Sequence, residues 1–482
     1  MVARDEHKHV ELPKEFLQKM RGLLGEREYA GFVESYGQER TSGLRLNPLK
    51  VLDAAAVLEL TARFGLEKIP WAESGYYYDR NTGPGRHVWH EAGVYYIQEP
   101  SAMAVAELLD ARPGDKVLDL CGAPGGKTTQ IGGGLKGRGL LVANEIHPAR
   151  AKILSQNVER MGISNGVVTN EEPRELSLRF PCFFDKVVVD APCSGEGMFR
   201  REPSMASDWE KKGPGYYAPV QREILRLACR MLRPGGILLY STCTFSEAED
   251  EGAAAWLLKE EPEIEQLALP AAHGAVQGTD GASLRLYPWR VKGEGHFAAL
   301  FRKKGGVSGR GADRSRPEAF RETESEEEGR RQKHNGLFLK GQPDLAKFRA
   351  QIRAPFDPEE RGYYWERDGE LYLLPLPPEE LPSLRYLRTG LFLGTVRRGR
   401  FAPSQALAMY LGKDAFSDTA DFPPEDVRTV KYLKGETVTA EGAFGRGGDG
   451  WCLVCTDGWP LGFAKRNGET LKNKYDPGWR WI

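Results

Sequence analysis

Two cysteine residues follow apolar runs and have polar neighbours, which is unusual for cysteines that only fill a core. Cys193 lies in VVVDAPCSGEGMFR (187–200), three residues after Asp190, and Cys243 lies in LLYSTCTFSEAEDE (238–251). A thiolate that attacks carbon-6 of cytosine turns the poorly reactive carbon-5 into an enamine carbon, which can accept a methyl group. A carboxyl group near ring N3 assists this attack, and a base must later remove the proton at carbon-5. Two thiols and one carboxyl group could supply these groups.

A glycine-rich turn between an apolar run and a helix could bind a nucleoside cofactor. It lies in KVLDLCGAPGGKTTQI (116–131), and its backbone amides would lie at the N-terminus of the following helix. A nucleoside triphosphate is disfavoured, because Cys121 stands where a phosphate loop ending at Lys127 requires glycine. Glu145 follows the next apolar run, where an acidic residue commonly binds a ribose diol in dinucleotide or S-adenosylmethionine folds. Taken alone, the turn is typical of either a cofactor site or a plain structural turn.

These residues need a sheet that brings their chain segments together. Four short, nearly continuous apolar runs alternate with amphipathic stretches at 149–161 and 221–232, which predicts buried parallel strands and covering helices. The predicted strands are 116–121, 140–145, 186–193 and 236–243. We therefore expect an α/β, doubly wound, Rossmann-like domain that binds ligands at the carboxyl ends of its strands. Cys193 and Cys243 should face one crevice of that domain.

Composition and pattern divide the 482-residue chain into five parts. The stretch 303–335 has a single Val, a single Phe and no Leu or Ile, which predicts a flexible linker. The acidic run 322–328 inside it could be a partner-binding tail, but a solvated linker is the favoured interpretation. The other expected parts are an N-terminal module (1–95), a catalytic domain (96–302), an intermediate domain (336–400) and a mainly β C-terminal domain (401–482). Outside the catalytic domain we predict a helix at 13–24, a strand at 44–48 and hairpins at 362–374 and 451–464.

The charges nearly cancel, since 67 Lys and Arg face 68 Asp and Glu, for a formal net charge of −1. The average would disfavour a polyanionic partner, but the charges are unevenly placed. Residues 385–413 contain no Asp or Glu and carry Arg385, Arg388, Arg397, Arg398, Arg400 and Lys413 among Tyr386, Phe392, Phe401 and Tyr410. Such a basic stripe is typical of phosphate contacts and base stacking, with a solvated surface as the alternative. A second candidate patch comprises Lys465, Arg466, Lys472, Lys474, Trp479, Arg480 and Trp481.

The cysteine pattern indicates a reducing compartment. Seven cysteines are spread unevenly over the chain, which predicts free thiols in the cytoplasm. Residues 1–10 have no apolar core, and no run of about 18 apolar residues occurs, so we expect neither a signal peptide nor a membrane span. Cys452 and Cys455 have zinc-like spacing, but no second Cys or His pair follows them, so we predict no metal.

The motifs resemble those of the RNA cytosine-C5 methyltransferases of the Nol1/Nop2/Sun group, and most closely the bacterial 16S ribosomal RNA methyltransferase F type. The paired DAPCSGEG and STCTF motifs are the most specific. The matching motifs are LRLNPLK (44–50), YYIQEPSAM (95–103), CGAPGGKTT (121–129), DAPCSGEGMFR (190–200), STCTFSEAEDE (241–251) and RLYPWRVKGEGHFAALFRK (285–303). The resemblance implies an S-adenosylmethionine-dependent methyltransferase domain, a small α+β N-terminal domain that contacts RNA, and a PUA-like RNA-binding module at the C-terminus.

The resemblance also implies roles for single residues. Cys243 would attack carbon-6, Cys193 would help to release the product, and Asp190 would hold the target cytosine near the cofactor. Glu145 would bind the ribose hydroxyls, and Glu172, which keeps the family spacing to Asp190, would contact adenine where relatives usually have Asp. The rest of the cofactor pocket would be lined by Cys121, Gly122, Ala123, Pro124, Gly125, Gly126 and Lys127. Where relatives often have Gly-Phe-Phe the chain has Gly295-His296-Phe297, which we interpret as a packing change.

The function implied is S-adenosylmethionine-dependent methylation of cytosine carbon-5 in ribosomal RNA, with 16S rRNA as the favoured target. Two alternatives stay open, namely the same chemistry on tRNA and a catalytically vestigial RNA-binding ribosome-assembly factor. The expected partner is ribosomal RNA or the small ribosomal subunit, with no membrane and no metal, and the chain is expected to be a monomer. Candidate RNA contacts are Arg45, Asn47, Lys50, Arg397, Arg398 and Arg400. For the first three, a capped turn with exposed charges is equally compatible.

Overall fold

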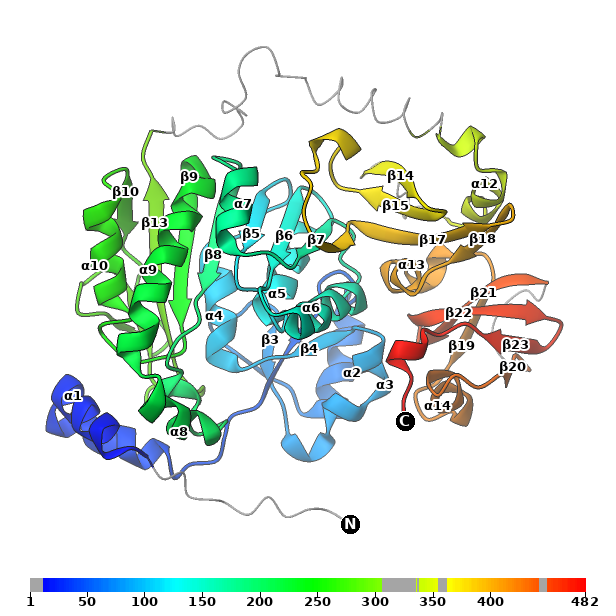
Figure 1. Ribbon diagram of the computed structural model, residues 1–482. Coiled ribbons are helices and arrows are strands. Elements are labelled where there is room, and N and C mark those ends of the chain that lie inside the picture. Colours follow the sequence, from blue (N-terminus) through cyan, green and yellow to red (C-terminus); the bar gives the residue numbers. More distant parts are fainter. Residues whose placement is uncertain (1–11, 306–334, 336–337, 354–361, 442–448) are drawn as a thin grey trace.

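The apolar runs predicted as strands form the parallel core of a mixed ten-stranded sheet (Figure 1). The computed structural model describes residues 12–305, 335, 338–353, 362–441 and 449–482. The predicted linker at 303–335 lies for most of its length outside these described residues, as does the stretch 1–10.

The strand order of the central sheet reverses at its middle. The order is β11-β12-β13-β9-β8-β5-β6-β7-β16, and β10 also pairs with β13. The parallel strands are β5 (Lys116–Asp119), β6 (Leu140–Asn144), β7 (Gly166–Thr169), β8 (Phe184–Asp190) and β9 (Leu232–Thr242). Because β5 lies between β6 and β8, the carboxyl ends of these strands form the crevice where doubly wound sheets bind ligands. The doubly wound fold is confirmed, and β7 is the parallel strand that our sequence prediction missed.

Antiparallel strands extend both edges of this sheet. On one edge β13 (His296–Lys303) pairs with β9 and carries β12 (Leu284–Leu286), β11 (Val276–Gln277) and β10 (Ile264–Leu267). On the other edge β16 (Tyr386–Thr389) pairs with β7. Since β16 follows the linker in the chain, a segment of the C-terminal half completes the catalytic sheet.

Helices cover both faces of the sheet, as the alternation of side chains along buried strands requires. One face packs against α4 (Pro100–Leu109), α5 (Gly126–Leu135) and α6 (Pro148–Arg160). The other packs against α7 (Pro173–Arg179), α9 (Pro214–Met231) and α10 (Glu251–Glu260). The predicted helices at 149–161 and 221–232 are therefore confirmed as α6 and α9, and α9 begins earlier than predicted.

The N-terminal part joins the catalytic domain at two places. α1 (Lys14–Ser35) packs Phe16, Met20 and Phe32 beside α8 (Ser204–Lys211). A four-stranded sheet then comprises β2 (Glu67–Lys68), β3 (Gly75–Tyr77), β1 (Gly43–Leu46) and β4 (Tyr95–Ile97), with α2 (Ala54–Phe64) and α3 (Val88–Glu91). The predicted boundary between residues 95 and 96 falls inside β4, so no break in the fold marks it.

The C-terminal part contains two further sheets. The first has the order β14 (Tyr363–Arg367), β15 (Glu370–Leu374), β17 (Leu391–Arg397) and β18 (Arg400–Pro403). The second has the order β19 (Thr419–Phe422), β21 (Gly450–Thr456), β22 (Trp459–Asn467), β23 (Thr470–Asn473) and β20 (Val438–Thr439). The accompanying helices are α12 (Pro343–Arg349), α13 (Gln405–Tyr410) and α14 (Val427–Leu433). Both predicted hairpins are confirmed, and the predicted boundary between residues 400 and 401 falls inside β18.

Candidate active site

The two thiols predicted to face one crevice lie side by side. β8 and β9 are parallel neighbours, with Asp190 opposite Ser241, and the Sγ atoms of Cys193 and Cys243 are 3.4 Å apart. Both cysteines lie in the loops that leave the carboxyl ends of these strands and are partly buried. The crevice prediction is therefore confirmed.

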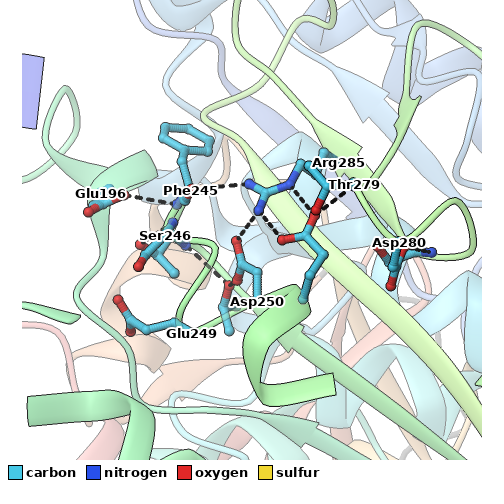
Figure 2. Close-up of polar contacts among 12 residues, drawn as sticks. Glu196, Phe245, Ser246, Glu249, Asp250, Thr279, Asp280 and Arg285 are labelled. Atoms are coloured by element: carbon cyan, nitrogen blue, oxygen red, sulfur yellow. Dashed lines mark hydrogen bonds and ion pairs between the residues drawn. The ribbon is translucent and has the colours of Figure 1, made fainter. Parts of the chain in front are cut away.

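Two carboxylates lock the cysteine loops to each other. Glu196, from the loop of Cys193, accepts a hydrogen bond from the Phe245 backbone N–H at 3.1 Å (Figure 2). Glu249, from the loop of Cys243, accepts one from the Ser194 N–H at 2.9 Å. The Gly197 N–H also donates to the Cys243 carbonyl at 2.8 Å. We call this exchange between Glu196 and Glu249 the reciprocal clasp, and it holds each cysteine relative to the other.

A buried arginine binds the loop that follows Cys243, at Phe245 and Asp250 (Figure 2). Arg285, from β12, donates to the Phe245 carbonyl at 3.2 Å and contacts Asp250 at 3.2 Å and Glu251 at the start of α10. Burial raises the pKa of the Asp250 carboxyl, although the Arg285 charge opposes this effect. Both backbone groups of Phe245 in this loop are thus held, the carbonyl by Arg285 and the N–H by Glu196.

Asp190 forms an ion pair at the edge of the thiol pair. Lys127 Nζ lies 2.8 Å from Asp190 Oδ2, and the Ser241 hydroxyl donates to Oδ1 at 2.8 Å. Burial by itself would raise the pKa of Asp190, but the lysine charge outweighs it and leaves the pKa below its ordinary value. The pKa of Lys127 is raised in turn, because the attraction to Asp190 exceeds the effect of burial. Asp190 is therefore an ionised carboxylate at neutral pH.

The predicted cofactor turn connects β5 to α5 and approaches its neighbours closely. Gly125 has φ 118°, a conformation that favours glycine. A Cβ atom on Gly122 would lie 2.8 Å from Thr128 Oγ1. Asp119, buried beneath the turn, accepts from the Thr128 hydroxyl at 2.5 Å, while its Oδ1 atom has no partner among the described residues. Burial raises the pKa of Asp119 to about 7.

The acidic residues assigned to the cofactor differ in exposure. Glu145 is buried after the end of β6, accepts from the His147 N–H at 2.9 Å and lies 3.3 Å from Arg150. Glu172 is exposed at the N-terminus of α7. Its neighbour Glu171 is buried and accepts from the backbone and side chain of Arg385. Glu145 thus lies buried at the carboxyl end of β6, whereas the side chain of Glu172 is exposed to solvent.

Burial contradicts two of the three RNA contacts predicted in the LRLNPLK motif, those of Arg45 and Asn47. The side chain of Arg45 is buried and donates to Gln98 Oε1 at 3.1 Å and Thr129 Oγ1 at 2.8 Å. Asn47 is also buried and donates to the carbonyls of Gly93 and Met161. Lys50 donates to the Ala92 carbonyl at 2.5 Å, and burial lowers the pKa of its amine to about 7. Arg45 and Asn47 thus join the N-terminal module to α5 and to the end of α6, whereas Lys50 is half-buried and stays a candidate RNA contact.

The two basic patches are only partly exposed. Arg388 is buried and pairs with Glu159 at 3.2 Å, Arg385 pairs with Glu171, and Phe401 belongs to the core of the C-terminal part. Arg397, Arg398 and Arg400 remain exposed at the turn between β17 and β18. In the second patch Arg466 is buried and pairs with Asp418 at 2.8 Å.

The two cysteines with zinc-like spacing face different cores. Cys452 packs with the cluster that contains Trp459, and Cys455 packs with the cluster that contains Phe463. An odd spacing along β21 sends their side chains to opposite faces of the sheet.

Sequence reasoning missed three features of the site. Neither the ion pair between Lys127 and Asp190 nor the reciprocal clasp was predicted, although the acidic residues that follow each cysteine motif were a visible signal. His296, interpreted as a packing change, lies 3.4 Å from Lys127 through its Nε2 atom. A polar residue in an otherwise apolar strand could have indicated this role of His296 in the sequence.

A doubly wound sheet with a close glycine turn and an acidic residue after the next strand defines a Rossmann-like methyltransferase domain. Models of known families match the chain along most of its length. They are the N-terminal domain of 16S rRNA methyltransferase RsmF (residues 12–100), 16S rRNA methyltransferase RsmB/F (106–302), the RsmF rRNA methyltransferase first C-terminal domain (347–411) and the methyltransferase RsmF PUA domain (419–481). The chain belongs to the 16S rRNA methyltransferase RsmB/F family and is an RNA methyltransferase.

Relatives match nearly end to end. The ribosomal RNA small subunit methyltransferase F of Escherichia coli O9:H4 (strain HS) is 31% identical over 97% of this chain and 96% of its own length. That of Enterobacter sp. (strain 638) is 31% identical over 96% of this chain and 95% of its own length. Both alignments extend through the C-terminal part, so the PUA-like region is confirmed.

Solved structures match part of the chain. A methyltransferase homologue from Pyrococcus horikoshii is 27% identical with a TM-score of 0.50, covering 61% of this chain and all (100%) of that one. NSun6 from Pyrococcus horikoshii, solved with SFG, has a TM-score of 0.54 at 22% identity and covers 61% of this chain and 99% of that one. The second likeness concerns the fold. Among the helices of the described residues, none is long and apolar enough to span a membrane.

Proposed function

We propose that the protein methylates cytosine carbon-5 in 16S ribosomal RNA with S-adenosylmethionine as methyl donor. The observation that carries the proposal is the pair of thiols 3.4 Å apart beside the Asp190–Lys127 ion pair. The substrate follows from the relatives, which are named as ribosomal RNA small subunit methyltransferases.

The residues around the cofactor turn fit S-adenosylmethionine. The turn from Cys121 to Lys127 leads into the N-terminus of α5, which begins at Gly126, and Glu145 would accept from the ribose hydroxyls. The unpartnered Oδ1 atom of buried Asp119 suits the ammonium group of the methionine moiety. When bound, S-adenosylmethionine supplies an electrophilic methyl group. Glu172 is our candidate for the adenine contact.

The chain's own residues divide the remaining chemistry. Attack of the Cys243 thiolate on carbon-6 forms a C–S bond, and carbon-5 becomes nucleophilic enough to take the methyl group. Asp190 is ionised, so it would orient the target base by accepting a hydrogen bond from its exocyclic amino group. Cys193 would take the carbon-5 proton as a thiolate and become a thiol. Loss of that proton breaks the C–S bond, restores the aromatic ring and returns Cys243 as a thiolate.

RNA would be held by exposed arginines at some distance from the thiols. Arg397, Arg398 and Arg400 lie at the β17–β18 turn without an ion-pair partner among the described residues, so they remain candidates for phosphate contacts.

The test is an asymmetry between the two thiols. We expect Cys243→Ala to abolish methyl transfer without forming an adduct. Cys193→Ala should accumulate a covalent protein–RNA complex on a denaturing gel, because the C–S bond forms but is not released. Cys182→Ala, at an exposed thiol, is the matched control and should keep wild-type activity. Adduct accumulation in Cys243→Ala instead would reverse the assignment.

The substrate is tested separately with labelled methyl donor. Naked 16S rRNA, small ribosomal subunits and tRNA are offered to the wild-type protein, and bisulfite sequencing locates the product. Transfer to tRNA alone would redirect the substrate. Binding of 16S rRNA without transfer to any RNA would favour a ribosome-assembly factor with vestigial chemistry.

A further inference from the structure

We propose that His296 is a positioning residue that accepts a hydrogen bond from Lys127 and holds its ammonium group against Asp190. The inference rests on the proposed function, because Asp190 matters only if it binds the target base. Three distances carry it. His296 Nε2 lies 3.4 Å from Lys127 Nζ, His296 Nδ1 lies 3.1 Å from Ser101 Oγ, and Lys127 Nζ lies 2.8 Å from Asp190 Oδ2.

The surrounding hydrogen bonds determine which nitrogen of His296 carries the proton. The Ser101 hydroxyl has one hydrogen, and it donates this hydrogen to Glu99 Oε2 at 2.5 Å. Glu99 is an acceptor for three backbone N–H groups as well, those of Ser101, Ala102 and Glu294, so both of its oxygens act as acceptors. Ser101 Oγ can therefore only accept from His296, which makes Nδ1 the protonated nitrogen. Nε2 is left with a lone pair that faces the Lys127 ammonium.

Burial and the Lys127 charge keep the His296 ring neutral. Glu99 at the start of α4, Lys127 on α5 and Asp190 on β8 all act on it. Burial first, and then the Lys127 charge, lower the pKa of His296 to about 4, although the two carboxylates oppose this shift. At neutral pH the ring thus accepts from Lys127 and does not repel it. Its side chain is only 4% exposed, so water has little access to replace it.

The consequence is a chain of contacts from the N-terminal end of α4 to the site. Glu99 orients Ser101, Ser101 orients His296, and His296 together with Asp190 directs two of the three Lys127 N–H groups. Phenylalanine, the residue that we expect in relatives at this position, would pack in the same space but would leave one buried N–H of Lys127 without an acceptor. Such a loss makes the charged form of Lys127 less stable.

The experiment compares three variants that separate the two ring nitrogens. His296→Gln can place an acceptor near the Nε2 position, His296→Asn can reach Ser101 but not Lys127, and His296→Phe removes both contacts. The first readout is independent of activity. Lys127 is followed by NMR with 13C-labelled lysine, and its signal is assigned with Lys127→Arg. We expect the titration midpoint of Lys127 to fall in the Phe and Asn variants and to stay near wild type in the Gln variant.

The second readout is steady-state methyl transfer against pH. The Phe and Asn variants should lose kcat by roughly tenfold to a hundredfold with little change in KM for RNA, because a misplaced catalytic group costs rate more than binding. The alkaline limb of kcat should move to lower pH in these two variants, whereas a purely structural defect would leave its position unchanged. The Gln variant should retain most of kcat.

Two results would overturn the inference. One is an unchanged Lys127 midpoint in folded His296→Phe. The other is an equal loss in His296→Gln and His296→Asn, since that would make the ring shape the relevant property. If the wild-type protein transfers no methyl group but the Lys127 midpoint shifts as expected, the proposed function fails and the positioning contact stands.

Discussion

At the residue scale, the site holds two carboxyl groups in different surroundings, since Asp119 is buried and Asp190 is partly exposed. Asp119 and Asp190 lie close enough to influence each other, yet burial raises the pKa of the first and Lys127 lowers that of the second. Only Asp190 has a cation within hydrogen-bond distance, which explains the opposite directions. Near pH 7 the protein therefore holds one ionised carboxylate, Asp190, and one carboxyl group, Asp119, that is close to its titration midpoint.

The raised pKa of Asp119 predicts a pH-dependent stability. A carboxyl group whose folded pKa of about 7 exceeds its ordinary value of 3.8 contributes stability that is fully present below pH 3.8 and is lost as pH rises through 7. In that window the unfolding free energy of the ligand-free protein should decline through this group by up to about 1.4 kcal/mol per pH unit. Asp119→Asn should remove this contribution, as measured by denaturant unfolding at several pH values.

The matched control is Asp368→Asn, at the exposed turn between β14 and β15. It should keep the wild-type pH profile between pH 4 and 7. A profile of Asp119→Asn that parallels the wild type would show that Asp119 is ionised throughout.

At the scale of elements, the distance between the thiols is set by the loops and not by the strands alone. β8 and β9 bring their ends together, but the loops could still diverge after residues 190 and 242. The reciprocal clasp prevents this, because a carboxylate from each loop accepts from the backbone of the other. Glu249 also accepts from the Ser194 hydroxyl and from Gln221 Nε2 at 2.9 Å, so its two oxygens serve three donor groups.

Glu249→Gln should loosen this clasp. One amide oxygen cannot serve the donors that two carboxylate oxygens serve, and the amide NH2 would face the Ser194 N–H. We expect a loss of about 1–3 kcal/mol in unfolding free energy and a lower rate of methyl transfer. Glu247→Gln, at an exposed position of the same loop, should stay within about 0.5 kcal/mol of wild type. Equal stability of the two variants by denaturant unfolding would contradict the role of the clasp.

At the scale of the whole molecule, the first and last parts of the chain share a core. Trp89 donates its indole N–H to Asp457 at 3.0 Å and meets Trp459 edge to face, with ring centroids 5.2 Å apart. Phe64 and Tyr432 belong to the same apolar cluster. Figure 1 shows α2 and α3 beside the C-terminal sheet. The PUA-like region is thus docked on the N-terminal module.

The exposed arginines at the β17–β18 turn predict that RNA binding depends on salt concentration. If Arg397, Arg398 and Arg400 each neutralise a phosphate, replacing all three by Ala should reduce the slope of log Kobs against log salt concentration by about 2 in magnitude. Filter binding to 16S rRNA across a salt series measures this slope. Arg138→Ala, exposed at the amino end of β6 and so at the opposite edge of the sheet, should leave the slope unchanged. An unaltered slope in the triple variant would place the RNA elsewhere.

The sequence by itself determined the local chemistry and the kind of fold. Apolar runs predicted the parallel strands. The motifs around Asp190 and Cys243 at the ends of those runs predicted the shared crevice, and strand-like runs separated by turn residues predicted both C-terminal hairpins. These features depend on neighbours in the chain, so a single sequence contains them. The tertiary structure decided which basic side chains are exposed and which are buried and paired inside the protein. Arg45, Arg388 and Arg466 look like surface cations in sequence and are buried because acceptors from distant segments meet them. The same holds for His296, whose partners Ser101 and Lys127 come from two other elements. Burial and hydrogen bonding across the chain have no local signature, and they divide the residues that hold the fold from those left to meet RNA.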